Sequence, residues 1–290
     1  MILNFTKYKK SSTYYGGSEK KFGITIDNVE YMIKFRKYNS FGEKTNNHIS
    51  EYIGSNIFRI LGFQVQETYL GFYGKEEVVA CKSFITNGNQ FVPFNDVGES
   101  TLEQDKSKYL YTYEDIMYML HSNSKLTNVE ETIRIFWEMF IVDALIGNFD
   151  RHGCNWGFLK RNNTYSLAPI FDNGSCLFPK ITSEELMKEI MNSEFETNKR
   201  VYTFPTSQIK IDDKKSSYFE VISSTKYKEC NEAVIKIYEK YSESDINKLI
   251  DEIELISNIQ KDFYKYMLKH RFEKIIKFTY KKLREENEKL

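Results

Sequence analysis

The sequence is short of cysteine and proline, and neither sign of charge is in excess. Four cysteines in 290 residues, at spacings that match no metal-binding motif, predict free thiols in a reducing cytoplasm. Lysine plus arginine equals aspartate plus glutamate at 41 each, so charge gives no general nucleic-acid footprint. No apolar run approaches the roughly 20 residues that span a bilayer, and a signal-peptide core is absent. We therefore expect a cytoplasmic protein without membrane insertion or direct nucleic-acid binding, and secretion as an effector is left open.

The composition also indicates how the chain is organised. About three-quarters of the unfolded surface can be buried at this length, which favours one bilobal unit. Turn residues break the periodicity near 86–112, with strand patterns before them and mainly helical patterns after them. We expect an α+β fold with a small β-rich N-lobe at 1–95 and a larger, mostly helical C-lobe at 96–290. The late helices are expected at 183–192, 228–241, 243–257 and 260–288.

The most informative stretch reads Gly-Asn-Phe-Asp-Arg-His-Gly-Cys-Asn-Trp-Gly at 147–157 and Ala-Pro-Ile-Phe-Asp-Asn-Gly at 168–174. Asp150 and Asn155 are separated by four residues, the interval between the catalytic aspartate and metal-binding asparagine of kinases. Asp172 lies seventeen residues beyond Asn155, where kinases place the aspartate of Asp-Phe-Gly. The spacing predicts transfer of the γ-phosphate of ATP, with Asp150 as general base and with Asn155 and Asp172 as Mg²⁺ ligands.

Two short strands are expected between these groups, at 156–160 and 165–171. A hairpin there folds Asp172 back towards Asp150. A buried helix at 128–146 would hold the loop, and Asp143 on it reads as a hydrogen-bonded structural carboxylate. The alternative is a pair of ordinary turns flanking a hairpin, but both halves in this order and spacing favour catalysis.

Parts that would hold a nucleotide are expected upstream. Residues 22–26 and 29–35 read as a β-hairpin on a two-residue Asp-Asn turn. Alternation puts Lys34 on the same face of the second strand as Met32. Lys34 resembles the lysine that contacts the α- and β-phosphates of ATP, and an exposed lysine on an edge strand is the alternative.

A helix that ends at Gly62 follows this hairpin. Glu51 in its first turns is the best candidate to pair with Lys34; Glu43 is the fallback, and surface solvation is the alternative for both. A further strand is expected at 77–85, and its end would pass the adenine. The backbone groups expected there belong to Ser83, Phe84 and Ile85.

The segment before the hairpin reads Ser-Ser-Thr-Tyr-Tyr-Gly-Gly-Ser-Glu-Lys-Lys at 11–21. It matches neither the P-loop nor the three-glycine kinase loop, and most glycine pairs are simple turns. Main-chain N–H groups approach phosphate closely where side chains are absent, so a phosphate-covering loop is an equal alternative. Its contributing residues would be Gly16, Gly17 and Ser18.

Together these residues resemble the HipA-like serine/threonine kinases, in particular short bacterial forms without the N-terminal subdomain of full-length HipA toxins. Ordered matches run over residues 12–175, and the loop at 147–157 is the most specific of them. The resemblance implies a protein-kinase-like fold, ATP and Mg²⁺ as cofactors, and a protein substrate with a serine or threonine acceptor. It also implies Asp150 as base, Asn155 and Asp172 as metal ligands, and Lys34 on the phosphates, oriented by Glu51.

Regulation and partners are likewise implied by the resemblance. It suggests autophosphorylation in the loop near residues 11–18, with Thr13 as the candidate by position and Ser11, Ser12 and Ser18 close behind. It further suggests a toxin or effector with a cognate antitoxin. The Asp-Arg-His order also resembles phosphoinositide 3/4-kinases, in which case His152 shares the acid–base role. A small-molecule or lipid kinase and a nucleotide-binding pseudokinase are the alternatives. The segment at 204–217 reads as irregular, either an acceptor-binding segment or a plain connection.

Overall fold

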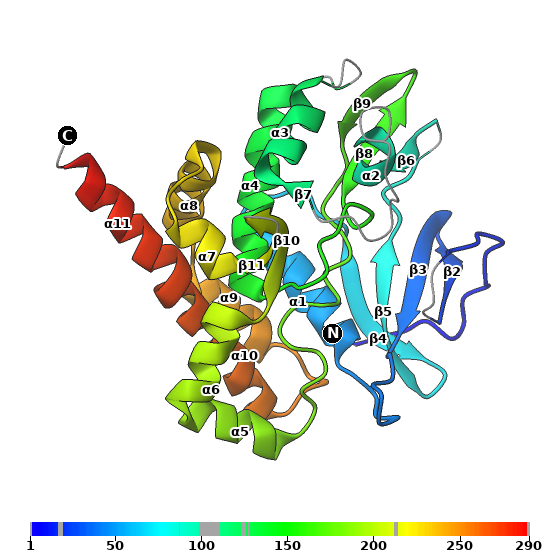
Figure 1. The fold of residues 1–290 in the computed structure, drawn as a ribbon. Coiled ribbons are helices and arrows are strands. Elements are labelled where there is room, and N and C mark those ends of the chain that lie inside the picture. The colour runs from blue at the N-terminus through cyan, green and yellow to red at the C-terminus, as the bar shows by residue number, and fades with distance from the viewer. Residues whose placement is uncertain are drawn as a thin grey trace. The chain divides into compact units, whose positions relative to one another are not determined.

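The computed structural model describes residues 2–16, 20–86, 88–98, 111–122, 126, 128–211 and 214–288. The protein is of the predicted α+β class (Figure 1). Its chain divides into two compact units. Unit 1 comprises Met1–Thr86, Pro169–Asn192 and Ser242–Tyr266, and unit 2 comprises Asn87–Ala168, Ser193–Tyr241 and Met267–Leu290. Each unit is assembled from three separate segments, whereas the lobes expected at 1–95 and 96–290 are each continuous in sequence.

Unit 1 contains a five-stranded sheet in the order β1-β4-β5-β3-β2. Its strands are β1 (Leu3–Asn4), β2 (Lys21–Ile26), β3 (Val29–Phe35), β4 (Thr68–Tyr73) and β5 (Glu76–Lys82). β2 and β3 form the predicted hairpin, in which Asp27 and Asn28 have left-handed φ values of 48° and 63°, as a type I′ turn requires. β3 is flanked by β2 and β5, so Lys34 does not lie on an edge strand.

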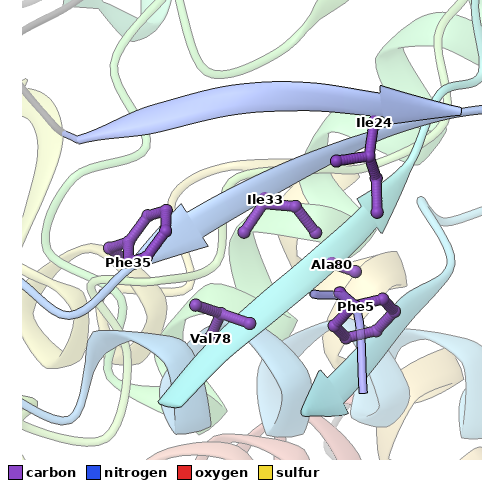
Figure 2. Packing of buried hydrophobic residues seen from close by; sticks show 6 residues of the cluster. All are labelled: Phe5, Ile24, Ile33, Phe35, Val78 and Ala80. Atoms are coloured by element: carbon purple, nitrogen blue, oxygen red, sulfur yellow. The ribbon is translucent and has the colours of Figure 1, made fainter. Parts of the chain in front are cut away.

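One face of this sheet carries an apolar core. Figure 2 shows its six central side chains, which come from β2, β3, β5 and the segment after β1: Phe5, Ile24, Ile33, Phe35, Val78 and Ala80. All six are almost completely buried, and burial of each large apolar side chain stabilises the fold by about 1.5–3 kcal/mol. Because side chains alternate along a strand, Lys34, between Ile33 and Phe35, belongs to the opposite face.

The helix α1 (Asn47–Ile60) packs against β4 and β5. Its buried residues include Ile49, Ile53 and Ile57, the helical spacing that predicted it. The chain leaves the helix through Gly62, whose φ of 87° is in the left-handed region that favours glycine. Unit 1 also contains the later helices α5 (Glu184–Asn192) and α9 (Glu243–Asp251), and α9 contacts α1.

Unit 2 is centred on α4 (Val129–Ile146), which is capped by Asn128 and buried along most of its length. It contacts α3 (Tyr113–Ser122), α7 (Tyr218–Ser223) and α8 (Lys228–Lys240). A three-stranded sheet, β6 (Gln90–Pro93), β8 (Gly157–Arg161) and β9 (Thr164–Leu167), includes the predicted β8–β9 hairpin. Shorter helices of this unit are α2 (Phe94–Gly98), α6 (Glu194–Asn198) and α11 (Phe278–Asn287). Across the described ranges, no helix is both long and apolar enough to cross a membrane.

The prediction of an irregular segment at 204–217 is wrong. Residues there form β10 (Thr206–Ile211) and β11 (Lys214–Ser217), which share a sheet with β7 (Tyr111–Thr112). Ser207 is completely buried, and its hydroxyl donates to the Ser216 carbonyl at 3.1 Å. A buried hydroxyl is tolerated when it is hydrogen-bonded, so this strand lacks the apolar alternation that marks most strands.

The last helices also differ from their predicted bounds. The helix expected at 243–257 ends at Asp251 as α9. The long helix expected at 260–288 consists of α10 (Asn258–Arg271), a π-helical segment η2 (Phe272–Lys277) and α11. A second π-helical segment, η1 (Lys199–Thr203), follows α6. Apolar periodicity hardly distinguishes α- from π-helical turns, so the sequence pattern does not predict these changes of helix type.

Candidate functional site

Lys34 of β3 forms two ion pairs within unit 1. Its Nζ lies 2.7 Å from Glu51 Oε2 and 2.9 Å from Asp172 Oδ1. Lys34 and Glu51 are buried, whereas the Asp172 side chain is 37% exposed. Burial alone lowers the pKa of Lys34, but the charges of Asp172 and Glu51 outweigh it and raise the pKa well above its ordinary value. Lys34 therefore stays protonated. Of the two glutamates considered in the sequence, Glu51 pairs with it and Glu43 does not.

Glu51 also holds the Asp-Asn-Gly triplet. Its Oε1 accepts a hydrogen bond from Asn173 N at 2.8 Å, and Asn173 Nδ2 donates to Ser55 Oγ of α1 at 2.9 Å. Gly54 permits this close approach, because a Cβ at that position would lie 2.7 Å from the Cβ of Asn173. Asp172 has a left-handed φ of 58°, a region in which aspartate and asparagine are enriched. The triplet is thus fixed on α1, with the Asp172 carboxylate beside the buried lysine.

The segment expected to pass the adenine follows β5 directly. Ser83 N donates to the Glu30 carbonyl at 2.8 Å, which continues the pairing of β5 with β3 beyond the end of β5. The Phe84 ring lies against Phe171, with 5.5 Å between the centroids, and Ile85 is 49% exposed. The segment therefore runs beside the strand that carries the fixed lysine. Its contact with adenine stays a prediction.

The predicted phosphate-covering residues are only partly within the described ranges. Gly16 is exposed, and no heavy atom would lie within 4 Å of a Cβ there. Gly17 and Ser18 lie outside the described residues. Glu30 of β3, which the sequence analysis did not single out, accepts hydrogen bonds from two hydroxyl groups of this loop.

The loop at 147–157 belongs to unit 2 and is organised by a buried carboxylate. Asp143 of α4 receives two hydrogen bonds from Arg151, from Nε at 2.8 Å and from Nη2 at 3.0 Å. Asn148 Nδ2 adds a third at 2.9 Å. Gly147, the first residue of the loop, ends α4 with a left-handed φ of 64°. Both charged groups are buried and mutually paired, so Asp143 is the structural carboxylate that the sequence predicted.

Asp150 and Asn155 are joined within this loop. Asn155 Nδ2 donates to the Asp150 carbonyl at 2.7 Å, and Asp150 N donates to Asn148 Oδ1 at 3.1 Å. The Asp150 side chain is 46% exposed, so the loop fixes its backbone and presents its carboxylate to solvent. His152 Nε2 lies 3.9 Å from Asp150 Oδ1, and His152 Nδ1 accepts a hydrogen bond from Cys154 N at 3.2 Å.

Three further residues support this loop and were missed in the sequence. Arg151 Nη1 donates to the Asn155 carbonyl at 2.9 Å, Gln208 Nε2 donates to the Phe149 carbonyl at 2.8 Å, and the Tyr218 hydroxyl donates to the Asn148 carbonyl at 2.7 Å. A signal existed for Arg151, because an arginine that becomes buried needs an anion and Asp143 was already singled out. Gln208 and Tyr218 reach the loop through tertiary folding alone, and no local pattern marks them.

Known proteins match this chain over nearly its whole length. The HipA-like C-terminal domain family matches residues 13–261. The serine/threonine-protein kinase CtkA of Helicobacter pylori is 36% identical over 280 residues, which cover 94% of this chain and 86% of that protein. The crystal structure of a Helicobacter pylori proinflammatory kinase CtkA matches with a TM-score of 0.91 and 34% identity, over 98% of both chains.

A more distant structure agrees in fold alone. It is a chain of the Shewanella oneidensis MR-1 toxin–antitoxin complex of HipA, HipB and operator DNA, with a TM-score of 0.55 and 17% identity over 94% of this chain and 65% of that one. The match to the Helicobacter pylori kinase confirms the predicted kinase-like α+β fold. The chain belongs to the HipA-like C-terminal domain family, and it is a serine/threonine protein kinase of the HipA-like type.

Proposed function

We propose that Lys34 and Glu51 form the ion pair with which this kinase binds the phosphates of ATP. The observation that carries the proposal is the buried Lys34 Nζ, 2.7 Å from Glu51 and 2.9 Å from Asp172. Phosphoryl transfer depends mainly on positioning and on neutralising phosphate charge. A lysine whose pKa is raised stays protonated, and Glu51 restricts where its charge can lie. In this assignment Lys34 contacts the α- and β-phosphates and Glu51 orients it.

Asn155 and Asp172 are the residues that would hold Mg²⁺. Their donor set, an amide oxygen and a carboxylate, suits a hard cation that also takes phosphate oxygens. Asn155 uses its Nδ2 in the bond to the Asp150 carbonyl, which leaves its amide oxygen as the ligand atom. The Asp172 carboxylate is partly exposed on a turn that Glu51 holds. When bound, the metal neutralises charge that develops on the phosphates.

Asp150 is the proposed general base. Its backbone is fixed by two hydrogen bonds, one that its N–H donates to Asn148 and one that its carbonyl accepts from Asn155. Its carboxylate is partly exposed, so it can accept a proton from the hydroxyl of the substrate. A positioned base contributes about 10²–10⁴ in rate. His152 is the second candidate for this proton, since its Nε2 lies 3.9 Å from the Asp150 carboxylate and its side chain is 38% exposed.

The acceptor is a protein hydroxyl, and the enzyme's own loop near residues 11–18 is the first candidate. Ser12 and Thr13 are exposed, whereas the Ser11 hydroxyl is bonded to Glu30, and Ser18 lies outside the described residues. Thr13 therefore stays the preferred site. The HipA of Shewanella oneidensis was solved with HipB, and a HipB-like antitoxin is the partner that the family suggests here. A toxin or effector role and a cytoplasmic location belong to the same proposal.

Transfer of label from γ-labelled ATP with Mg²⁺ tests these roles. Purified protein, alone and with a bacterial lysate, is compared with Asp150→Asn and with Asp262→Asn as matched control. Asp262 lies on α10 with its side chain 64% exposed. We expect the control to transfer label like the wild type, and Asp150→Asn to lose at least about a hundredfold while its ATP affinity changes a few-fold at most. Equal transfer by Asp150→Asn and the wild type would show that this residue is not the base.

A further inference from the structure

The carboxylate of Glu30 ties the loop that precedes β2 to the sheet of unit 1. Its Oε1 accepts hydrogen bonds from the Ser11 hydroxyl and, at 3.2 Å, from the Tyr15 hydroxyl. Its Oε2 lies 3.5 Å from the hydroxyl of Thr25 on β2. Ser11 is bonded a second time, because its N–H donates to the Gly23 carbonyl at 2.9 Å. One side chain therefore holds both ends of the segment from Ser11 to Tyr15.

These contacts lie on the face of the sheet that carries Lys34. Alternation along β3 places Glu30, Met32 and Lys34 on one face, opposite the apolar core of Figure 2. Glu30 and Lys34 are four positions apart on the extended strand, which corresponds to roughly 13 Å. At the Glu30 end, its carbonyl accepts the hydrogen bond from Ser83, the first residue of the segment expected to pass adenine. The strip from Glu30 to Lys34 thus runs from the proposed adenine end to the proposed phosphate end.

Gly23 of β2 is the residue that makes room for this arrangement. It pairs with Met32, so a side chain at Gly23 would project onto the same face. A Cβ built there would overlap both the Glu30 carboxylate and the Ser11 hydroxyl. The backbone of Gly23 does not need a positive φ, so packing of these two groups is the reason for a glycine.

The rest of the loop makes few packing contacts that would place it. Tyr14 is 89% exposed, Ser12 and Thr13 are exposed, and Gly16 would meet no heavy atom within 4 Å of an added Cβ. Tyr15 is half-buried, and burial followed by the charge of Glu30 raises the pKa of its hydroxyl above the ordinary value, so it remains a hydrogen-bond donor. The hydrogen bonds to Glu30 are thus the main side-chain attachment described for this segment.

We propose that Glu30 is a positioning residue for ATP, which holds the loop from Ser11 to Gly16 over the Lys34 face of the sheet. This rests on the proposed function of Lys34 as the phosphate-binding lysine. Main-chain N–H groups bind phosphate well only when their loop is already in place, because ordering the loop on binding costs affinity. Glu30 orders the loop before ATP binds, because the hydroxyls of Ser11 and Tyr15 donate hydrogen bonds to it.

Two measurements on the full chain test the proposal. Hydrogen–deuterium exchange of ATP-free protein reports on the amides of Ser11 and Thr13, which donate to Gly23 and to the Ser11 hydroxyl. Titration with ATP and Mg²⁺ gives the dissociation constant. Glu30→Ala should speed exchange of these amides and weaken ATP binding about tenfold, the order expected for loss of hydrogen bonds to a charged acceptor. Tyr15→Phe, which removes one hydroxyl, should weaken binding about threefold.

Conservative variants separate positioning from general damage. Glu30→Gln keeps an acceptor oxygen and should bind ATP within about threefold of the wild type. Glu189→Gln, on the exposed side of α5, is the matched control and should change neither readout. Unchanged exchange in both Glu30→Ala and Tyr15→Phe would overturn the proposal, as would faster exchange with unchanged or tighter ATP binding. Failure of the underlying function looks different, because Lys34→Met would then bind ATP as the wild type does.

Discussion

Removal of the Glu51 carboxylate tests the ion pair at the centre of unit 1. Its two oxygens make two hydrogen bonds, one from Lys34 Nζ at 2.7 Å and one from Asn173 N at 2.8 Å. The side chain is 1% exposed, so neither donor has water as a substitute when it is removed. Glu51→Ala should therefore destabilise the protein, because Lys34 loses its buried partner and the Asn173 amide loses its acceptor.

The magnitude follows from what remains after the substitution. Breaking a buried ion pair on one side costs about 3–5 kcal/mol, because the other charge stays buried without compensation. Lys34 keeps Asp172 at 2.9 Å, but that side chain is 37% exposed and is a weaker partner. We therefore expect the lower end, about 3 kcal/mol, a large part of the 5–15 kcal/mol typical of a folded domain. Glu51→Gln keeps the volume and an acceptor oxygen and should cost about half as much.

Urea unfolding of a double-mutant cycle measures the pairwise part of this energy. The cycle comprises wild type, Lys34→Met, Glu51→Gln and the double variant. Each single variant removes the charge that faces one buried group, whereas the double variant removes both charges. The double variant should therefore be less destabilised than the sum of the singles by about 2 kcal/mol. A coupling below about 0.5 kcal/mol would refute the view that Lys34 and Glu51 interact directly.

Two further predictions concern the metal and the pH dependence of stability. Asp172→Asn keeps a residue type that tolerates the φ of 58° but removes the carboxylate, so we expect turnover to fall at least about a hundredfold and ATP binding to lose its Mg²⁺ dependence. Calorimetric ATP titrations with and without Mg²⁺ decide this, and a full Mg²⁺ response in the variant contradicts the metal role. Burial lowers the pKa of His48, although the Glu77 carboxylate, 3.2 Å from His48 Nε2, acts in the opposite direction. His48 is therefore protonated at a higher pH in the unfolded chain than in the folded protein. The free energy of unfolding should fall as the pH drops through about 6.5. Urea unfolding from about pH 8 to about pH 5 should show a smaller decline for His48→Gln, and equal declines would exclude this contribution.

Features that depend on local chemistry were predictable from the sequence. The Asp27-Asn28 turn supplies two residues that tolerate positive φ, so the β2–β3 hairpin and the side of β3 that bears Lys34 follow from it. The apolar spacing of α1 and α4 reflects their burial directly. The pairing of Lys34 with Glu51 was predicted from the likeness to kinases, since the helix after the hairpin carries this glutamate in its first turns.

Features that depend on tertiary structure were not predictable in this way. Nothing in the local pattern of Pro169–Asn192 or Ser242–Tyr266 shows that these segments join the unit formed by residues from the first third of the chain. The partners of Glu30 lie on a loop fifteen or more residues away in sequence, and a glutamate in a strand is usually solvated. Gly23 offered a signal, since a glycine inside a strand marks a close approach of another group, but it does not say which group.

Burial divides the acidic residues around Lys34 and around the loop at 147–157 into two kinds. Glu51 and Asp143 are each 1% exposed and fully engaged, and each bonds to the segment that carries a more exposed carboxylate, Asp172 or Asp150. A buried carboxylate is stable only with its hydrogen bonds complete, so it is suited to fixing a backbone and not to exchanging protons or ligands. A partly exposed carboxylate on a fixed backbone is suited to exchanging protons or ligands. The motif spacing alone does not distinguish these roles, whereas exposure supports the proposal that the first pair positions the backbone and the second pair takes part in the chemistry.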